Sequence, residues 1–144
     1  MRQRIVRALA SCFYVGYLPA PGAWGSAVGL AIAWYSSPNF SYELGLITLA
    51  GYWLTVFSKD AFSSTDPAPF VLDEVCGMML SVLFLPKTWA VYAAAFVVFR
   101  VLDVWKPWPI SILQNMKNSF SIMHDDLAAG FFANLIVHSY LKIF

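Results

Sequence analysis

Long stretches without charged side chains alternate with short polar segments along this chain. From residue 8 to residue 42 there is no Asp, Glu, Lys, Arg or His. Prolines and a glycine within 19–22 interrupt this stretch and leave apolar segments at 5–18 and 23–36. The first is too short to cross a bilayer comfortably and predicts an interfacial or re-entrant helix, whereas the second predicts a membrane span.

Four further apolar stretches follow and complete an all-α pattern. They predict spans over 42–57, 71–85, 88–104 and 125–143. The proline-containing segment 58–69 predicts a loop, and 106–121 predicts a second loop with a short interfacial stretch at 110–116. The predicted fold is a compact polytopic membrane helix bundle of about five spans plus the short N-terminal helix, with residues 1–144 in one membrane-embedded domain.

Composition indicates a membrane protein and limits its partners. Of the 144 residues, 60% are hydrophobic and 12% are charged, and the mean hydropathy is +0.65. Soluble domains carry about 25% charged residues, and the predicted spans leave no room for a separate soluble catalytic domain. Nine basic and eight acidic side chains give a net charge of +1, which is too even for a nucleic-acid binder. Cys12 and Cys76 predict neither a disulfide framework nor a zinc site, because neither has a partner at ligand spacing.

The order of the predicted spans places most acids on one membrane face. Because successive spans alternate in direction, the residues that begin the first, third and fifth spans lie beside those that end the second and fourth. Seven of the eight acids, all except Glu43, then lie on one face, although they extend from Asp60 to Asp126. Most bases lie there too if 5–18 does not cross, so the positive-inside rule predicts that this face is cytoplasmic.

Converging carboxylates need a compensating charge. An acid at the centre of an apolar membrane helix costs roughly 2.5 to 3.5 kcal/mol. The acids near the span ends are hard oxygen ligands of the kind that Mg²⁺ prefers: Asp66, Asp73, Glu74, Asp103, Asp125 and Asp126. Two interpretations stay open at this point, a divalent metal site and a set of ion pairs with Arg100 and Lys106.

Two pairs of acids are adjacent in the sequence, and the side chains of adjacent residues on a helix point in different directions. Adjacent residues point about 100° apart, so we expect one member of each pair, 73–74 and 125–126, to enter the pocket. A glycine follows Asp73 and Asp126 at four residues' distance and leaves room beside each acid for a helix or a ligand. We therefore expect Asp73 and Asp126 to face inward.

Two other segments carry groups suited to an anion. An arginine, an aspartate and a lysine recur every three residues at 100, 103 and 106, which places them along one helix face. Guanidinium and ammonium groups there suit a phosphate. The segment 19–26 opens a helix whose free backbone N–H groups suit an anion, and Ser26 adds a hydroxyl.

Four motifs follow one another along the chain. They are PAPGAWGS at 19–26, DPAPFVLDEVCGM at 66–78, FRVLDVWKPWPI at 99–110 and MHDDLAAG at 123–130. In this order and at these separations they resemble the phosphatidylglycerophosphatase A family of bacterial membrane enzymes, over nearly the whole chain. The resemblance implies Mg²⁺-dependent hydrolysis of the phosphate monoester of phosphatidylglycerophosphate to phosphatidylglycerol and inorganic phosphate, at the bacterial inner membrane.

The residue patterns and the resemblance together imply roles for individual side chains. The implied metal ligands are Asp73, Glu74, Asp103, Asp125 and Asp126. Asp66 and His124 are candidates for residues that contact these ligands without binding the metal themselves. The implied catalytic groups are Asp73, Asp126, Arg100 and Lys106, the two cations neutralising charge on the phosphoryl oxygens. The implied substrate contacts are Pro21, Gly22, Ser26, Arg100 and Lys106. Whether water or a carboxylate is the nucleophile stays open.

The chain departs from the family's usual pattern at three positions. Ala23 stands where threonine is usual, so any hydroxyl role there is lost or passes to Ser26. His124 stands where an apolar residue is expected and Cys76 where valine is common, and neither change removes a charged group.

Two other function classes remain as alternatives. Another phospholipid-headgroup enzyme, such as a CDP-alcohol phosphotransferase, would carry a DG-rich acidic signature, which is missing from the sequence. A cation-coupled transporter would carry acids near the bilayer midplane and inverted repeats, whereas the acids here are expected at one face and no repeat is present.

Overall fold

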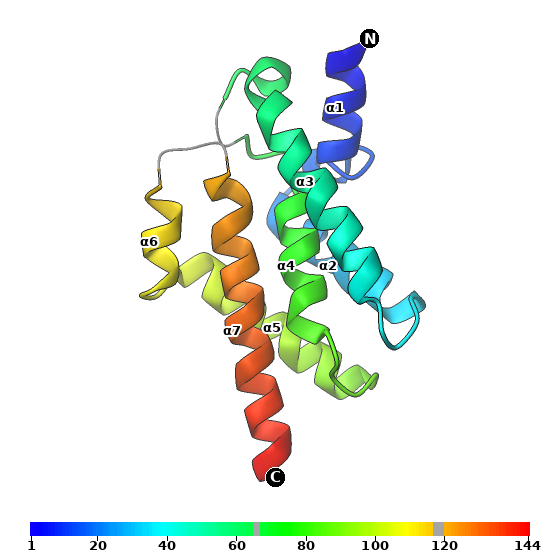
Figure 1. The fold of residues 1–144 in the computed structure, drawn as a ribbon, viewed down its shortest axis with the longest axis vertical. Coiled ribbons are helices and arrows are strands. Elements are labelled where there is room, and N and C mark those ends of the chain that lie inside the picture. The colour runs from blue at the N-terminus through cyan, green and yellow to red at the C-terminus, as the bar shows by residue number, and fades with distance from the viewer. Residues whose placement is uncertain (65–66, 117–119) are drawn as a thin grey trace.

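The computed structural model describes residues 1–64, 67–116 and 120–144, which form seven α-helices and one short 3-10 helix and contain no strand. The all-α prediction is confirmed. In chain order the elements are α1 (Arg2–Ala10), η1 (Val15–Tyr17), α2 (Pro21–Tyr35), α3 (Ser41–Phe62), α4 (Leu72–Val82), α5 (Trp89–Trp105), α6 (Ile110–Gln114) and α7 (Ser121–Ile143). Figure 1 shows their arrangement, with α1 at one end of the molecule and the C-terminus of α7 at the other.

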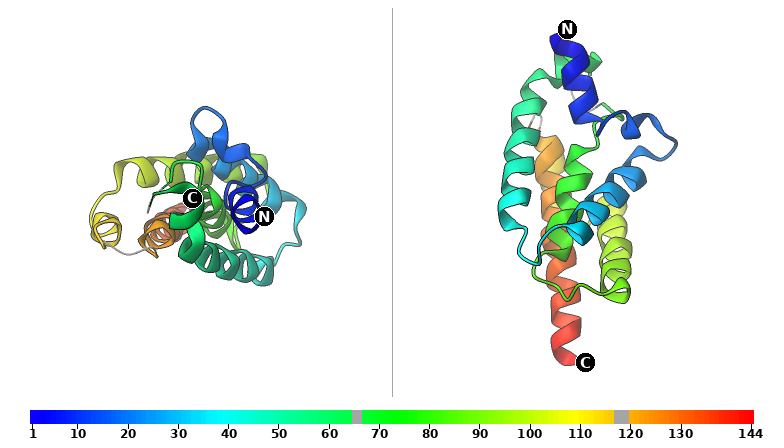
Figure 2. Two further views of the ribbon diagram at one scale, coloured as in Figure 1. Left: turned by 90° about the horizontal axis from the view of Figure 1, so that it is seen from above. Right: turned by 90° about the vertical axis from the view of Figure 1, so that its right-hand side faces the viewer.

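Helix α4 is the centre of the bundle. It packs against α2, α3, α5 and α7, and nine of its eleven residues are buried. Figure 2 shows α7 running alongside α4 and then projecting beyond the other helices at its C-terminal end. Residues of α4 can therefore contact four neighbouring helices, so a site built from several helices is expected to include residues of α4.

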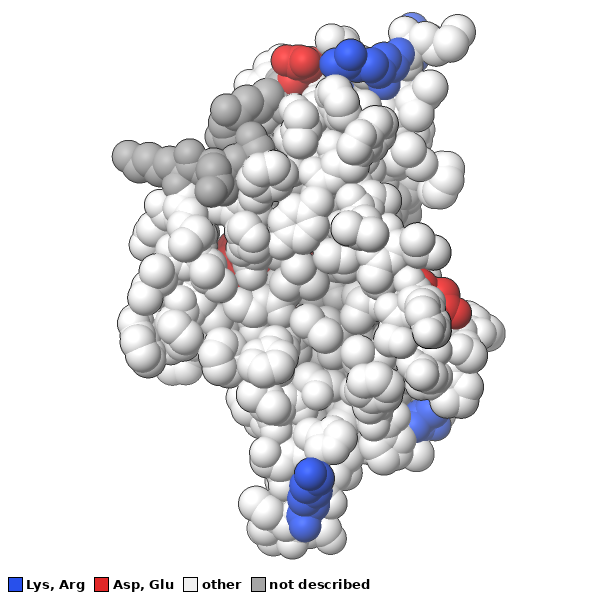
Figure 3. Space-filling model, in the orientation of Figure 1, with Lys and Arg blue, Asp and Glu red and all other residues white. Residues whose placement is uncertain are grey.

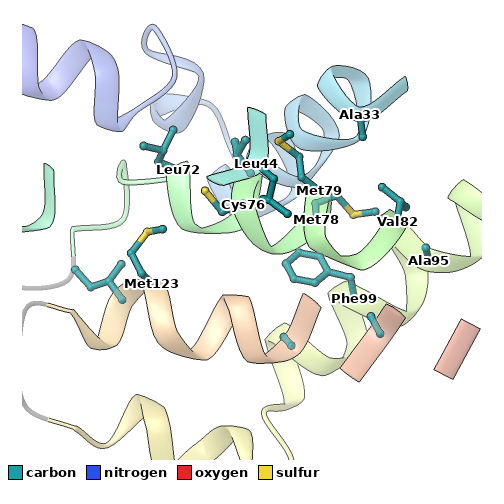
Figure 4. Packing of buried hydrophobic residues seen from close by; sticks show 14 of the residues in the cluster. Ala33, Leu44, Leu72, Cys76, Met78, Met79, Val82, Ala95, Phe99 and Met123 are labelled. Carbon is teal, nitrogen blue, oxygen red and sulfur yellow. The ribbon is translucent and has the colours of Figure 1, made fainter. Parts of the chain in front are cut away.

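The apolar core surrounds α4. Met78, Met79 and Val82 of this helix meet Phe99 of α5 and Ala33 of α2, as Figure 4 shows. The side chains of Met78, Met79 and Phe99 are fully buried. The unbranched methionines fill the irregular spaces between helices that cross at different angles.

Glycines set the closest helix contacts. A Cβ at Gly77 would lie 2.5 Å from the carbonyl oxygen of Asp126, and one at Gly130 would lie 2.2 Å from the carbonyl oxygen of Gly77. Gly29 of α2 similarly faces the carbonyl oxygen of Val75 at 2.5 Å. The prediction that small residues permit close helix contact is confirmed, because backbone meets backbone at each of these positions.

Alanine at Gly130 is expected to destabilise the protein by about 1 to 3 kcal/mol, because the added methyl would displace the backbone of α4. Gly45 of α3 is the matched control, since a Cβ there would meet nothing within 4 Å. Its replacement by alanine should be neutral or stabilise the helix by up to about 1 kcal/mol. Thermal unfolding of the two variants in detergent compares these effects, and equal melting temperatures would contradict the packing argument.

The N-terminal apolar segment differs from its prediction. Instead of one helix over 5–18, α1 ends at Ala10 and η1 follows at Val15–Tyr17. Cys12, Phe13 and Tyr14 between them all have positive φ. The Ser11 hydroxyl donates to the carbonyl oxygen of Arg7 at 2.6 Å and accepts from the N–H of Tyr14 at 3.0 Å. The Ser11 side chain therefore bonds to backbone groups in place of the regular helical hydrogen bonds, so the helix ends and the chain turns here.

The other helices differ from the predicted spans mainly at their ends. Helix α7 begins at Ser121, one turn before the predicted 125–143, and α3 continues to Phe62 beyond the predicted 42–57. The Asn134 amide of α7 donates to the carbonyl oxygens of Ser81 and Leu83 at 3.1 and 2.8 Å, which satisfies backbone groups at the end of α4.

Among the described residues no helix combines the length and the hydropathy of a membrane span.

Candidate functional site

Three carboxylates from two helices meet near the N-terminal ends of α4 and α7. Asp73 and Glu74 lie in the first turn of α4, and Asp126 lies in the second turn of α7. One oxygen atom from each carboxylate lies within 4.8 Å of the others. The close contact of α4 and α7 at Gly77 brings the two helices near enough for the carboxylates to meet. Asp73 and Asp126 are inward-facing, as predicted, with exposed fractions of 7% and 4%.

The chemistry of this cluster suits a divalent cation. Glu74 Oε2 is buried and has no hydrogen-bond partner among the described residues. A buried carboxylate oxygen without a donor or a counter-charge is costly, and several buried carboxylates close together also repel one another. A hard divalent ion such as Mg²⁺ would satisfy the oxygen atoms and offset the repulsion. The donor set therefore fits such an ion.

Two ion pairs border the carboxylate cluster. Arg100 pairs with Asp103 one turn later on α5, and Lys106 pairs with Asp125 of α7. All four side chains are mostly buried, with exposed fractions between 7% and 23%. The ion-pair interpretation therefore applies to Asp103 and Asp125, whereas the metal interpretation stays a prediction for the other three carboxylates, which cluster.

Lys106 lies directly after α5, in a left-handed conformation with φ of 46° that ends the helix. Burial by itself would lower the pKa of its ammonium group. The hydrogen bond and the negative charge of Asp125, together with the charges of Asp126 and Asp103, outweigh burial and raise that pKa above its usual value. Lys106 is therefore a permanent positive charge beside the cluster.

The first motif reaches the same place from α2. A Cβ at Gly22 would lie 3.0 Å from an Arg100 guanidinium nitrogen and 3.0 Å from Glu74 Oε1. Pro21 and Gly22 occupy the first turn of α2, where backbone N–H groups have no partner within the helix. The missing side chain at position 22 is therefore what allows Arg100 and Glu74 to lie against this helix end.

A cavity of about 220 Å³ lies against Lys106 and the acids of both groups, whereas Pro21, Gly22 and Arg100 are not among its described lining residues. Its described lining includes Asp73, Glu74, Asp103, Lys106, Asp125 and Asp126, together with Pro67, Ala68, Phe70, Gln114, Ser121 and Ile122. Five acids and a lysine from α4, α5 and α7 thus share one space. The prediction that acids from distant motifs converge is confirmed for these five.

Comparison with known proteins agrees with this arrangement. The sequence profile of a family described as Phosphatidylglycerophosphatase A matches residues 8–141. The chain belongs to this family. An Escherichia coli protein named phosphatidylglycerophosphatase A is 36% identical over 131 residues, which cover 85% of this chain and 75% of the relative. A Haemophilus influenzae protein of the same name is 31% identical over 140 residues, covering 92% and 86%. No solved structure matches significantly.

Membership of the phosphatidylglycerophosphatase A family makes the chain an enzyme, a phosphatase. All four motifs contribute, because they supply the clustered carboxylates, the two ion pairs and Gly22, which lies against Arg100 and Glu74. The lining residues Phe70, Gln114 and Ser121 were not among the predicted site residues. Gln114 lies at the end of the short helix α6, and no motif marks it in the sequence.

Some predicted site residues lie elsewhere. The Ser26 hydroxyl is buried and donates to the carbonyl oxygen of Gly22 at 2.8 Å, within α2. His124 does not line the cavity, and its ring lies 5.5 Å from that of Tyr52 on α3. Asp66 lies outside the described residues. Asp60 is exposed and lies 3.6 Å from Arg2, outside the lining of the cavity.

The two acid pairs behave differently. Of the 125–126 pair, Asp126 joins the carboxylate cluster and Asp125 binds Lys106, but both line the cavity, so the expectation that one member alone enters the pocket is wrong for this pair. Of the 73–74 pair, both members join the cluster, so the expectation of one inward acid is wrong there. The N–H of Glu74 donates to Asp73 at 3.0 Å, which turns the Asp73 carboxylate back toward its neighbour in the first helical turn.

Proposed function

We propose that this enzyme removes the phosphate monoester of phosphatidylglycerophosphate, giving phosphatidylglycerol and inorganic phosphate in phospholipid biosynthesis, with Mg²⁺ required. The observation that carries the proposal is the grouping of three carboxylates with Lys106 at one cavity, where Arg100 is paired with the lining residue Asp103. The named relatives supply the substrate. We infer no transferase or transporter activity, since no observation favours either.

Asp73, Glu74 and Asp126 are the residues proposed to hold the metal, with Asp103 and Asp125 as further oxygen donors at the same cavity. When bound, a divalent ion polarises phosphoryl oxygens and lowers the pKa of a bound water. The role of the protein is to hold the three carboxylates close together and partly shielded from solvent. The packing of Gly77 against α7 does this, because it holds the two helices at contact distance.

Arg100 and Lys106 are proposed to bind the phosphate monoester. A guanidinium can donate two parallel hydrogen bonds to phosphoryl oxygens, and an ammonium acts as a point charge. Asp103 and Asp125, which line the cavity, each hold one of these bases in an ion pair, so little further side-chain freedom is lost when the substrate binds. The backbone N–H of Gly22, in the first turn of α2 and next to Arg100, is a further proposed donor to the anion, whereas Pro21 has no N–H to offer.

We propose that the domain, residues 1–144, lies in the bacterial inner membrane as a multi-pass protein with the site at the cytoplasmic face. Large apolar side chains cover the outside of the bundle, including Leu46, Leu49, Trp53, Val97, Val101 and Leu135. On the face drawn in Figure 3, Lys and Arg lie toward the two ends of the molecule and the surface between them carries few charges. This distribution suits a bilayer around the middle of the bundle.

Release of inorganic phosphate from phosphatidylglycerophosphate in mixed micelles tests the proposal. The purified protein should release phosphate with Mg²⁺, lose this activity when EDTA is added, and regain it when Mg²⁺ is returned in excess. Transfer of the phospholipid group to an alcohol without phosphate release would indicate a phosphotransferase instead. Full activity in EDTA would remove the metal from the proposal.

A further inference from the structure

A second cavity adjoins the carboxylate cavity. It measures about 410 Å³, and its described lining is Arg7 of α1, Tyr17 of η1, Phe62 of α3, Ser64 and the loop residues Pro67, Ala68 and Pro69 before α4. Pro67 and Ala68 of this loop line both cavities, which therefore share a wall. None of the proposed roles above uses this second space.

Arg7 is the one charged side chain among the described residues that line the second cavity. Its Nε donates to the carbonyl oxygen of Ala61 at 2.5 Å, across from α1 to the last turn of α3. This bond fixes the plane of the guanidinium. The Tyr17 side chain adds a phenol to the same lining. A guanidinium held in this way, in a cavity that a phenol also lines, is suited to an oxyanion.

The second cavity is held firmly relative to the first. The N–H of Val71, which precedes α4, donates to the carbonyl oxygen of Ala10 at 3.0 Å. A Cβ at Gly16 would lie 2.1 Å from the carbonyl oxygen of Pro69, so η1 is in backbone contact with the loop. Both contacts lie within a few residues of Asp73. The position of Arg7 is therefore coupled to the carboxylate cluster.

We propose that the Arg7 cavity binds the phosphodiester of the same lipid molecule whose terminal phosphate enters the carboxylate cavity. The inference rests on the proposed function, because phosphatidylglycerophosphate carries a phosphomonoester and a phosphodiester separated by one glycerol unit. Two anion sites that share a wall match two such groups. A diester has two free oxygen atoms and one negative charge, which a single arginine satisfies. Arg7 thereby selects lipids that carry a diester.

Turnover of two lipids by the Arg7→Gln variant tests the proposal. Phosphatidylglycerophosphate has both phosphates, whereas phosphatidic acid with the same acyl chains has the monoester alone. The variant should raise KM for phosphatidylglycerophosphate by about tenfold with little change in kcat, and leave the kinetics on phosphatidic acid unchanged. Arg4→Gln is the matched control, because Arg4 lies on the same helix and does not line the cavity.

A second readout serves where phosphatidic acid is hydrolysed too slowly. Phosphatidylglycerol keeps the diester and lacks the monoester, so its inhibition constant should rise about tenfold in Arg7→Gln while that of orthophosphate stays constant. Arg7→Lys should recover part of the affinity, although it lacks the bond to Ala61. Equal losses on both substrates, or equal effects of Arg4→Gln, would overturn the proposal in favour of a structural role or general attraction to anionic micelles. A wild-type protein inactive on phosphatidylglycerophosphate would instead overturn the proposed function, and the inference with it.

Discussion

Replacing Asp126 by alanine is expected to lower Mg²⁺-dependent phosphate release by about three orders of magnitude, the range that follows from loss of one key electrostatic group. Asp126 is buried and shares the cluster with Asp73 and Glu74. Its removal takes one of three donors from the proposed metal site. The Asp73→Ala variant should behave in the same way.

The Asp126→Ala protein should remain folded. Three carboxylates this close together, two of them buried, repel one another when no cation lies between them, so removing one relieves repulsion. The melting temperature measured in EDTA is therefore expected to stay equal or rise, while activity is lost. This combination separates a functional residue from a structural one.

Asp60→Asn is the control for these variants. Asp60 is an exposed acid that lies 3.6 Å from Arg2 and does not line the cavity, so its replacement should leave activity unchanged. If Asp126→Ala keeps nearly wild-type turnover, Asp126 has no part in the metal site. If its melting temperature falls sharply, the carboxylate has a structural role that the repulsion argument does not describe.

The sequence predicted the middle of most helices well. The expected 88–104 corresponds to α5 at Trp89–Trp105, and the expected 23–36 corresponds to α2 at Pro21–Tyr35. Prolines and polar turns bound both segments, so local chemistry determined the ends. The prediction of a single helix over 5–18 was wrong, because hydropathy alone does not reveal a turn within an apolar segment. The bonds of the Ser11 hydroxyl to the backbone break the helix there.

Convergence of the acids followed from the alternation of helix direction, which depends only on the order of the helices. Their individual contacts did not follow from it. Asp125 and Asp126 are adjacent, yet one meets Lys106 and the other meets the carboxylates of α4. That choice depends on how α7 is rotated against α4, and the rotation is set by the contact between Gly77 and Gly130.

Residues brought to the site by loops and short helices escaped prediction altogether. Gln114 reaches the cavity from α6, and Arg7 reaches the adjoining cavity from α1. Neither belongs to one of the four motifs. Their positions depend on contacts between distant segments, such as the bond from Arg7 to Ala61, which local sequence patterns do not encode.

Replacing Arg100 by alanine is expected to lower kcat/KM by about 100-fold, because the variant loses the guanidinium that neutralises charge on the phosphoryl oxygens. It also leaves the Asp103 carboxylate without its partner beside the three clustered acids. Arg100→Lys should retain the charge and recover part of the activity. It should remain below wild type, since lysine cannot donate two parallel hydrogen bonds.

Lys87→Gln is the control for Arg100→Ala, because it removes one positive charge at another place in the protein. Lys87 is exposed, donates to the carbonyl oxygen of Ser36 at 2.8 Å and lies outside the cavity lining, so turnover should not change. Steady-state kinetics on phosphatidylglycerophosphate compare the three variants. If Arg100→Lys equals wild type, only the charge matters and the forked geometry does not. If Arg100→Ala and Lys87→Gln lose activity equally, the effect comes from the protein's overall charge, and Arg100 does not bind the phosphate.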